Sequence, residues 1–197
     1  MAGRRGGLNF YKKNKRLSRE QLMGIFSYVF LGVLMCFFAF TCVYLFGIRT
    51  SIIGASMEPT LYNGEEILID RFQYFFSEPD RDDVIVFLPN GNTNSHYYVK
   101  RVLGIPGDTV LIKDGMIYVN GKIYDRNGLF ERAADGGTAK NGLTLGENEF
   151  FVLGDNLNDS EDSRSGNIGV VRKEYILGKA WFAFTSDEGL GESGFIK

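Results

Sequence analysis

The chain has 197 residues, which is enough for one folded domain and an appendage. Its 25 glycines and 14% aromatic residues favour a β-rich body with many turns. The net charge of −2 conceals an uneven distribution, because residues 1–20 carry seven basic side chains and one acidic one, a net +6, and the rest carries −8. Both cysteines, Cys36 and Cys42, lie before residue 49, so a disulfide framework is excluded for the remainder and a hydrophobic core must stabilise it.

An uncharged apolar run of 27 residues extends from Leu22 to Ile48. As a helix it would be about 40 Å long, enough to cross a hydrocarbon core of about 30 Å. A cleavable secretory signal has an apolar region of only ~7–15 residues, so we predict an uncleaved transmembrane signal anchor over 21–48. The alternative is a buried helix of a soluble protein.

The basic residues of 1–20 directly precede this apolar run. A basic tail can bind nucleic acid, but this position favours a membrane explanation, and we expect no nucleic-acid partner. The positive-inside rule then predicts a single-pass protein of the cell membrane. Residues 1–20 would form a cytoplasmic tail, and the body that follows the anchor would be extracytoplasmic.

After residue 49 the sequence changes to short extended segments separated by turn residues. Residues 66–70, 84–88 and 171–184 have strand patterns, and Asp114-Gly115 and Asn120-Gly121 mark hairpin turns on either side of 116–119. We therefore predict a mainly antiparallel β body over 49–186, with a small β-ribbon insertion at about 110–150. Residues 187–197 are expected to form a flexible C-terminal tail.

Ser56, in the stretch Gly-Ala-Ser-Met-Glu-Pro-Thr, and Lys100, in Tyr-Val-Lys-Arg-Val-Leu-Gly, are the candidate nucleophile and base. A serine hydroxyl needs a neighbour that removes its proton, and a buried neutral lysine can do so if its pKa falls from ~10.4 to about 7 or 8. Strand alternation puts Lys100 on one face with Tyr98 and Val102. Taken alone, the sequence around Ser56 favours an ordinary turn residue, and most strand lysines such as Lys100 are solvated. His96, the only histidine, is interpreted as a surface residue because no acidic orienter accompanies it.

Together with Gly-Asp-Asn-Leu-Asn-Asp-Ser-Glu-Asp-Ser-Arg at 154–164, these motifs resemble those of bacterial type I signal peptidases of the short, Gram-positive kind. The resemblance runs from about Arg49 to Phe184. It implies an antiparallel β-sheet body of the signal peptidase and LexA-like type after one transmembrane helix. It also implies a serine endopeptidase that removes signal peptides from exported precursors through an acyl-enzyme, without a cofactor or a metal.

The resemblance further implies a role for each matching residue. Asp155 is expected to pair with Arg101, the neighbour of the base, because a buried guanidinium needs a partner. Ser160 is expected to hydrogen-bond to the Lys100 nitrogen and orient it towards Ser56. Asp162 and Arg164 would form an ion pair that braces the same loop.

Two departures from the family pattern affect the site. Gly54 stands where many members have a serine that helps hold the oxyanion, so the Ser56 N–H would do more of this work, aided by a group exposed at Gly54. Leu157 replaces the usual arginine, and two extra residues lie between Arg164 and Gly169; we expect only local consequences.

The signal peptide is expected to lie extended along a sheet edge in shallow pockets that accept small side chains. The residues expected to line these pockets are Ile52, Met57, Leu61, Ile67, Tyr98 and Val99. A position in the core is an equally good interpretation of Ile67. The partners are then signal-peptide-bearing precursors and the lipid bilayer, and the oligomeric state stays open. Two rival functions are a catalytically silent relative that assembles surface polymers such as pilins, and a self-cleaving repressor-type protease.

Overall fold

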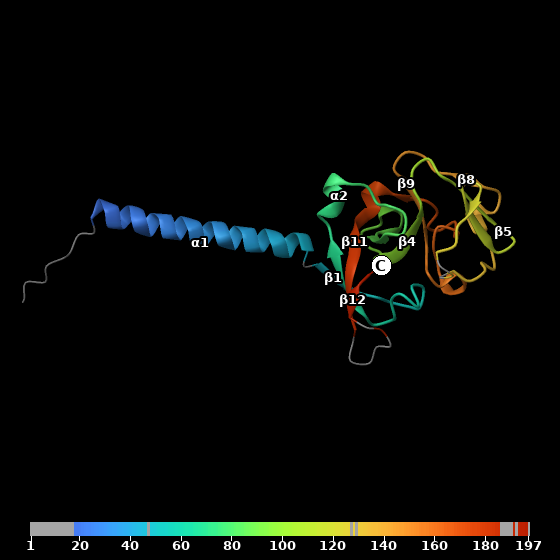
Figure 1. Ribbon diagram of the computed structural model, residues 1–197, viewed down its shortest axis with the longest axis horizontal. Helices are drawn as coiled ribbons and strands as arrows, with labels where there is room; N and C mark the ends of the chain where they lie inside the picture. Colours follow the sequence, from blue (N-terminus) through green and yellow to red (C-terminus); the bar gives the residue numbers. More distant parts are fainter. Residues whose placement is uncertain are drawn as a thin grey trace, which may run out of the picture. The chain divides into compact units, whose positions relative to one another are not determined.

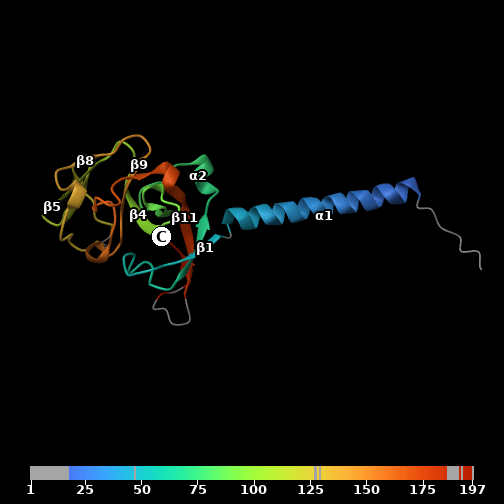
Figure 2. The ribbon, with the colours of Figure 1, turned by 180° about the vertical axis from the view of Figure 1, so that it is seen from behind.

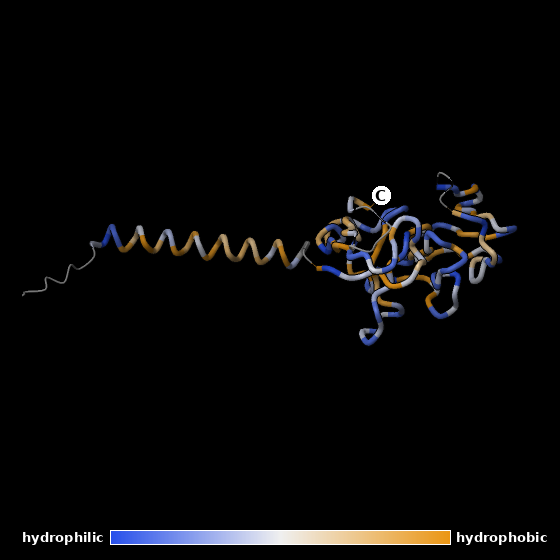
Figure 3. The backbone as a smooth tube through the Cα atoms, turned by 90° about the horizontal axis from the view of Figure 1, so that it is seen from below, coloured by the Kyte–Doolittle hydropathy of each residue, from blue (hydrophilic) through white to orange (hydrophobic). Residues whose placement is uncertain are grey.

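The computed structural model describes residues 18–46, 48–126, 128, 130–185, 191 and 193–196. The chain divides into a unit of residues 1–41 and a unit of residues 42–197. Of the predicted basic tail, residues 1–17 lie outside the described part. Helix α1 (Arg19–Phe46) contains a stretch, Arg19–Tyr44, that is long and apolar enough to cross a membrane. Figure 3 shows this apolar character along most of the helix, after a hydrophilic start.

The body combines two β-sheets, and every strand pair in them is antiparallel. The strands are β1 (Ile48–Ser51), β2 (Glu66–Asp70), β3 (Val84–Phe87), β4 (Tyr98–Gly104), β5 (Thr109–Lys113), β6 (Met116–Val119), β7 (Lys122–Ile123), β8 (Leu143–Thr144), β9 (Glu149–Leu153), β10 (Val171–Arg172), β11 (Ile176–Phe184) and β12 (Gly194–Phe195). The helical turns are α2 (Gln73–Phe76), η1 (Pro89–Gly91), η2 (Gly137–Ala139), η3 (Leu157–Asp159) and η4 (Lys173–Tyr175).

The large sheet has the strand order β1-β2-β11-β3-β4-β9-β10, with β12 added beside β11. The small sheet has the order β7-β6-β5-β8 and corresponds to the predicted insertion. Within the body, β5 and β8 lie on one side and β1, β11 and α2 on the other, as both ribbon views show (Figures 1 and 2). The mainly antiparallel β fold class predicted from the sequence is confirmed.

The apolar run of β3 explains why this strand lies in the middle of the large sheet. Val84 and Val86 pack into one core cluster, and Ile85 and Phe87 pack into another. Because successive side chains of a strand point to opposite faces, both faces of the sheet are covered here. A third cluster joins the small sheet to β4 and β9, so both of these strands pack against a hydrophobic core.

The two predicted hairpin turns are present in the small sheet. Asp114 and Gly115 have φ values of 53° and 77°, and Asn120 and Gly121 have φ values of 52° and 76°. Positive φ at both central residues is the requirement of the tight hairpin turn that Asn-Gly and Asp-Gly favour. These turns set the pairing of β6 with β5 and β7.

The C-terminal segment differs from its predicted description. Residues 187–190, 192 and 197 of the expected flexible tail lie outside the described part, but Gly194–Phe195 forms β12 and pairs with Ala183 and Phe182 of β11. The Phe195 ring also meets the Phe182 ring edge-on at 5.4 Å between centroids. A backbone ladder and an aromatic contact therefore fix a segment in which we expected no structure.

Candidate active site

Ser56 lies in the turn that follows β1, and buried neighbours hold this turn in place. Met57 and Leu61 are 1% and 0% exposed, and the Leu61 N–H donates to the Met57 carbonyl. The Ser56 carbonyl accepts a hydrogen bond from the Asn156 N–H at 3.1 Å. The turn is therefore attached both to the core and to the loop after β9, and it presents a half-buried serine.

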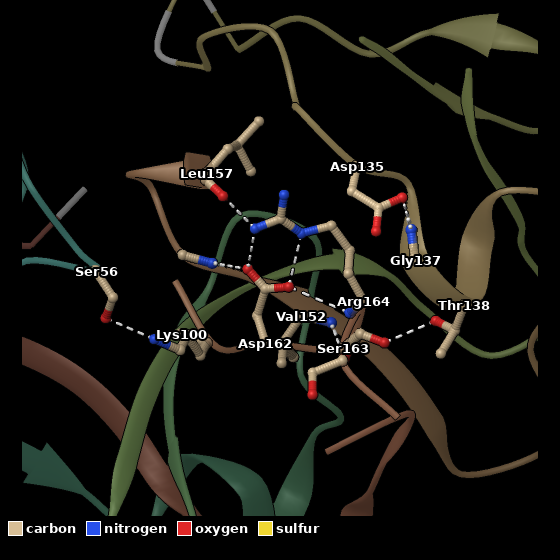
Figure 4. A network of polar contacts seen from close by, with 12 residues as sticks. Ser56, Lys100, Asp135, Gly137, Thr138, Val152, Leu157, Asp162, Ser163 and Arg164 are labelled. Carbon is tan, nitrogen blue, oxygen red and sulfur yellow. Dashed lines mark hydrogen bonds and ion pairs between the residues drawn. The ribbon is translucent and has the colours of Figure 1, made fainter. Parts of the chain in front are cut away.

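Lys100 lies in the middle of β4, paired with Ile85 of β3, and it is only 3% exposed. Its Nζ donates a hydrogen bond of 2.5 Å to Ser56 Oγ, and Figure 4 shows the two side chains pointing toward one another. Burial lowers the pKa of Lys100 from 10.5 to about 8, partly opposed by the nearby carboxylates of Asp162, Glu161 and Asp155. A neutral amine is therefore accessible near neutral pH, within reach of one hydroxyl.

Arg101, the next residue of β4, is paired with Asp155 in a buried bidentate ion pair. Its Nε and Nη2 each lie 2.7 Å from a carboxylate oxygen of Asp155, and the two side chains are 1% and 0% exposed. Thr60 donates to the same carboxylate at 2.5 Å, and the Asp82 carbonyl accepts from Arg101 Nη1 at 2.7 Å. The pairing expected from the sequence is present, and it neutralises the cation beside the base.

Asp162 and Arg164 brace the loop that runs from β9 to residue 164. Nε and Nη2 of Arg164 lie 2.8 Å from the two Asp162 oxygens, and the guanidinium also donates to the Leu157 carbonyl (Figure 4). The Gly154 N–H donates to Asp162 at 3.2 Å. The predicted ion pair and these hydrogen bonds thus connect the start of the loop, at Gly154 and Leu157, to its end, at Asp162 and Arg164.

Ser163, which was not predicted, fastens this loop to β9. Its hydroxyl accepts the Val152 N–H at 2.9 Å, and its carbonyl accepts the Thr138 hydroxyl at 2.7 Å (Figure 4). A serine between Asp162 and Arg164 gives no sequence signal that distinguishes this role from a surface turn. Its complete burial shows that the role is structural.

Ser160 does not make the hydrogen bond to Lys100 that we expected. Its buried hydroxyl has no hydrogen-bond partner among the described residues. It lies close to the Ser56 backbone, because a Cβ added at Gly154 would be 2.3 Å from Ser160 Oγ and 2.4 Å from the Ser56 carbonyl oxygen. The serine is therefore next to the site, but its hydroxyl makes no hydrogen bond to Lys100 or to another described residue.

The Gly54 N–H donates to Asn63 Oδ1 at 2.8 Å. The expected help from a group exposed at Gly54 stays a prediction, and in this structure that group is not the Gly54 N–H itself. Gly54 has φ +90°, a conformation that favours glycine, and the space beside it is open. Among the described residues the Ser56 N–H has no acceptor, so it is free to bind a developing charge.

A groove of about 390 Å³ runs past the Ser56–Lys100 pair. Of the residues expected to line pockets, Ile52, Met57, Tyr98 and Val99 line this groove. Leu61 and Ile67 do not: both are fully buried in the core cluster beneath it, because the turn and β2 direct them inward. The groove is completed by residues that were not predicted as contacts, namely Ser51, Ile53, Ala55, Ser95, His96, Tyr97, Asp159 and Glu161.

A larger hollow of about 530 Å³ lies elsewhere, between α2 and the connections that follow β3 and β10. Neither Ser56 nor Lys100 lines this hollow, so we assign the candidate active site to the smaller groove, which contains both residues. No group of three or more potential metal ligands occurs among the described residues.

Comparison with known proteins places the chain in a family. Residues 24–185 match the family model described as signal peptidase, peptidase S26. The chain belongs to this family. Signal peptidase I P of Bacillus subtilis subsp. natto is 36% identical over 132 residues, which cover 64% of this chain and 70% of that protein. Signal peptidase I S of Bacillus subtilis strain 168 is 36% identical over 143 residues, 66% of this chain and 73% of that protein.

A solved signal peptidase structure is also similar. The crystal structure of a signal peptidase I from Enterococcus faecalis V583 is 30% identical, covers 52% of this chain and 97% of its own chain, and superposes with a TM-score of 0.42.

Proposed function

We propose that this signal peptidase family member is a membrane-anchored serine endopeptidase that removes signal peptides from exported precursors. The observation that carries the proposal is the 2.5 Å contact between Lys100 Nζ and Ser56 Oγ, with the amine buried and its pKa lowered to about 8. A lysine with a pKa this low is deprotonated in an appreciable fraction of molecules near neutral pH and can act as a general base, and a serine next to such a base is an activated nucleophile.

In the proposed reaction, neutral Lys100 takes the Ser56 proton while Oγ attacks the carbonyl at the end of the signal peptide. The Ser56 N–H faces the resulting oxyanion, and an oxyanion donor contributes about 3 kcal/mol to transition-state stabilisation. The Lys100 ammonium then gives its proton to the departing amine of the mature protein. A water then loses its proton to Lys100 as it attacks the acyl-enzyme carbonyl, and the Lys100 ammonium returns that proton to Ser56 Oγ as the ester bond breaks, which regenerates Ser56 and neutral Lys100.

The substrate would lie extended in the groove between the stretch 51–56 and the stretch 95–100. The first of these includes the end of β1, and the second leads into β4, so a peptide could add its backbone to either segment. Ile52, Met57 and Val99 are almost completely buried, so they form a shallow apolar floor. Such a floor suits small side chains before the cleaved bond.

The anchor would hold the catalytic body at the outer face of the membrane. Support comes from the apolar stretch Arg19–Tyr44 and from the basic residues before it. A tether of this kind raises the effective concentration of the site near emerging cleavage sites.

Cleavage of a fluorogenic signal-peptide substrate by the full-length protein in detergent tests the proposal. Ser56→Ala and Lys100→Ala are each expected to reduce kcat by at least about a thousandfold, because each removes a reacting group. Lys122→Ala is the control, since Lys122 is an exposed lysine on β7 away from the groove. Cleavage that persists in Ser56→Ala, or a wild type that cleaves nothing, would contradict the proposal.

A further inference from the structure

Glu161 forms part of the groove wall next to the Ser56–Lys100 pair, and hydrogen bonds hold its carboxylate there. The Tyr98 hydroxyl donates to Oε2 at 3.1 Å, and Asn167 Nδ2 donates to Oε1 at 3.3 Å. Tyr98 belongs to β4, the strand that carries Lys100, so the first bond joins the loop to that strand. A carboxylate that accepts one hydrogen bond at each oxygen is directed by both partners, and it still has acceptor capacity towards the groove.

The groove has an acidic wall above an apolar floor. Its charged lining residues are Lys100, Asp159 and Glu161. The lining also contains three other ionisable side chains, namely His96 and two tyrosines. In the reactive state Lys100 is neutral, so the described lining then presents two carboxylates and no lysine or arginine charge. A peptide lying there meets a negative potential close to the bond that is cut.

We propose that Glu161 selects precursors with a lysine or arginine side chain near the cleaved bond and disfavours aspartate or glutamate at the same place. This inference rests on the proposed function and adds a charge preference to the small-residue preference of the groove floor. The carboxylate attracts a cationic side chain at short range and repels an anionic one. Glu161 is thus a specificity-determining residue within the 154–164 motif, at a position to which the sequence analysis assigned no role.

The test compares peptides that differ at one position only. The full-length protein in detergent is given signal-peptide substrates with Lys, Gln or Glu at the second residue before the cleaved bond, or at the first or second residue after it. The measured quantity is the ratio of kcat/KM for the Lys peptide to that for the Glu peptide. This ratio cancels any effect of Glu161 on the protonation of Lys100, since the base is the same for both peptides.

For at least one position the wild-type ratio is expected to be roughly three- to tenfold at low salt, as attraction and repulsion each contribute a factor of about two to three. It should fall towards one as salt is raised. It should also approach one in Glu161→Gln and drop below one in Glu161→Lys. Glu147→Gln is the matched control, because Glu147 is an exposed glutamate in the turn between β8 and β9 outside the groove lining; it should keep the wild-type ratio.

Several results would overturn the inference. These are a wild-type ratio near one at all three positions, a ratio unchanged in Glu161→Gln, and a ratio that is lost in Asp159→Asn but kept in Glu161→Gln. In each of these cases the Gln peptide is still cleaved in a Ser56-dependent manner, so the proposed function stands. Failure to cleave the Gln peptide would instead contradict the proposed function, and the charge preference with it.

Discussion

At the residue scale, Lys100 is unusual because it is a lysine with almost no exposure to water and no carboxylate bonded to it among the described residues. Its one hydrogen bond among the described residues goes to Ser56 Oγ, while the carboxylates of Asp155 and Asp162 are each paired with an arginine. Because these carboxylates are paired with arginines, they offset only part of the lowering of the Lys100 pKa by burial. The lowered pKa is therefore a property of the arrangement around the lysine and not of the lysine alone.

This arrangement predicts a pH-dependent stability difference. The unfolded chain has Lys100 at its ordinary pKa of 10.5 and the folded chain at about 8, so the unfolded state binds more protons between these values. Stability of the wild type should therefore rise with pH across that window. Relative to Lys100→Met, the wild type should gain roughly 3 kcal/mol between pH 7 and pH 10.5. Urea unfolding of both proteins measures the gain, and a constant difference would contradict a lowered pKa.

The Asp155–Arg101 pair predicts a large loss on removing one partner. Asp155→Asn leaves a guanidinium buried without its counter-charge, which costs roughly 3–5 kcal/mol of unfolding free energy. Glu174→Gln is the control, because Glu174 pairs with Arg172 on the surface, with side chains 64% and 59% exposed, and it should change stability by less than about 0.5 kcal/mol. Equal effects in the two variants, measured by urea unfolding, would show that burial of the Asp155 pair is unimportant.

Sequence reasoning predicted two pairs of residues from their chemistry or from the family motif, and the structure brings each pair into contact. These pairs are Ser56 with Lys100 and Arg101 with Asp155. It did not place the Ser160 hydroxyl, because a rotamer depends on neighbours that only the folded loop brings together. It also assigned Leu61 and Ile67 to the groove, since the side of a sheet that an apolar residue faces depends on which elements cover it.

At the element scale, the loop from β9 to residue 164 and the turn carrying Ser56 are packed so closely that Gly154 has no space for a side chain. An added Cβ would approach Ser160 Oγ to 2.3 Å and the Ser56 carbonyl oxygen to 2.4 Å. The contact at Ser56 is with its backbone carbonyl oxygen, which cannot move away by a side-chain rotation. The hairpin turns of the small sheet were predictable from adjacent residues, whereas this contact joins segments about a hundred residues apart.

Gly154→Ala is therefore expected to displace the Ser56 turn and to reduce kcat/KM at least about a hundredfold, since small misplacements of reacting groups have effects of this size. Gly166→Ala is the control, because nothing lies within 4 Å of a Cβ at Gly166. Its kcat/KM should stay within about a factor of two of the wild type. Activity of Gly154→Ala similar to that of Gly166→Ala would mean that the close approach does not position the nucleophile.

At the scale of the whole molecule, the sequence predicted the division into an apolar helix and an antiparallel β body, because long uncharged runs and hairpin signals are local. It did not predict β12, a two-residue strand whose pairing with β11 depends on the completed sheet. Orientation in the membrane rests on the distribution of basic residues. This orientation is a prediction, and the fold of the body is independent of it.

Membrane orientation can be measured with single cysteines introduced after Cys36 and Cys42 are replaced by alanine. In intact bacterial cells, a membrane-impermeant maleimide is expected to label Ile123→Cys, whose parent side chain is 56% exposed on the small sheet. It should label Asn9→Cys only after the membrane is permeabilised. Labelling of Asn9→Cys but not Ile123→Cys in intact cells would reverse the proposed topology.

The most direct test of the central claim, a buried lysine acting as the base for Ser56, is the pH dependence of kcat/KM for a neutral signal-peptide substrate. Only the deprotonated amine can take the Ser56 proton, so kcat/KM should rise with pH and level off, with a midpoint at about 8 set by Lys100. A midpoint near the ordinary lysine value of 10.5, or a rate independent of pH between 6 and 10, would contradict the account.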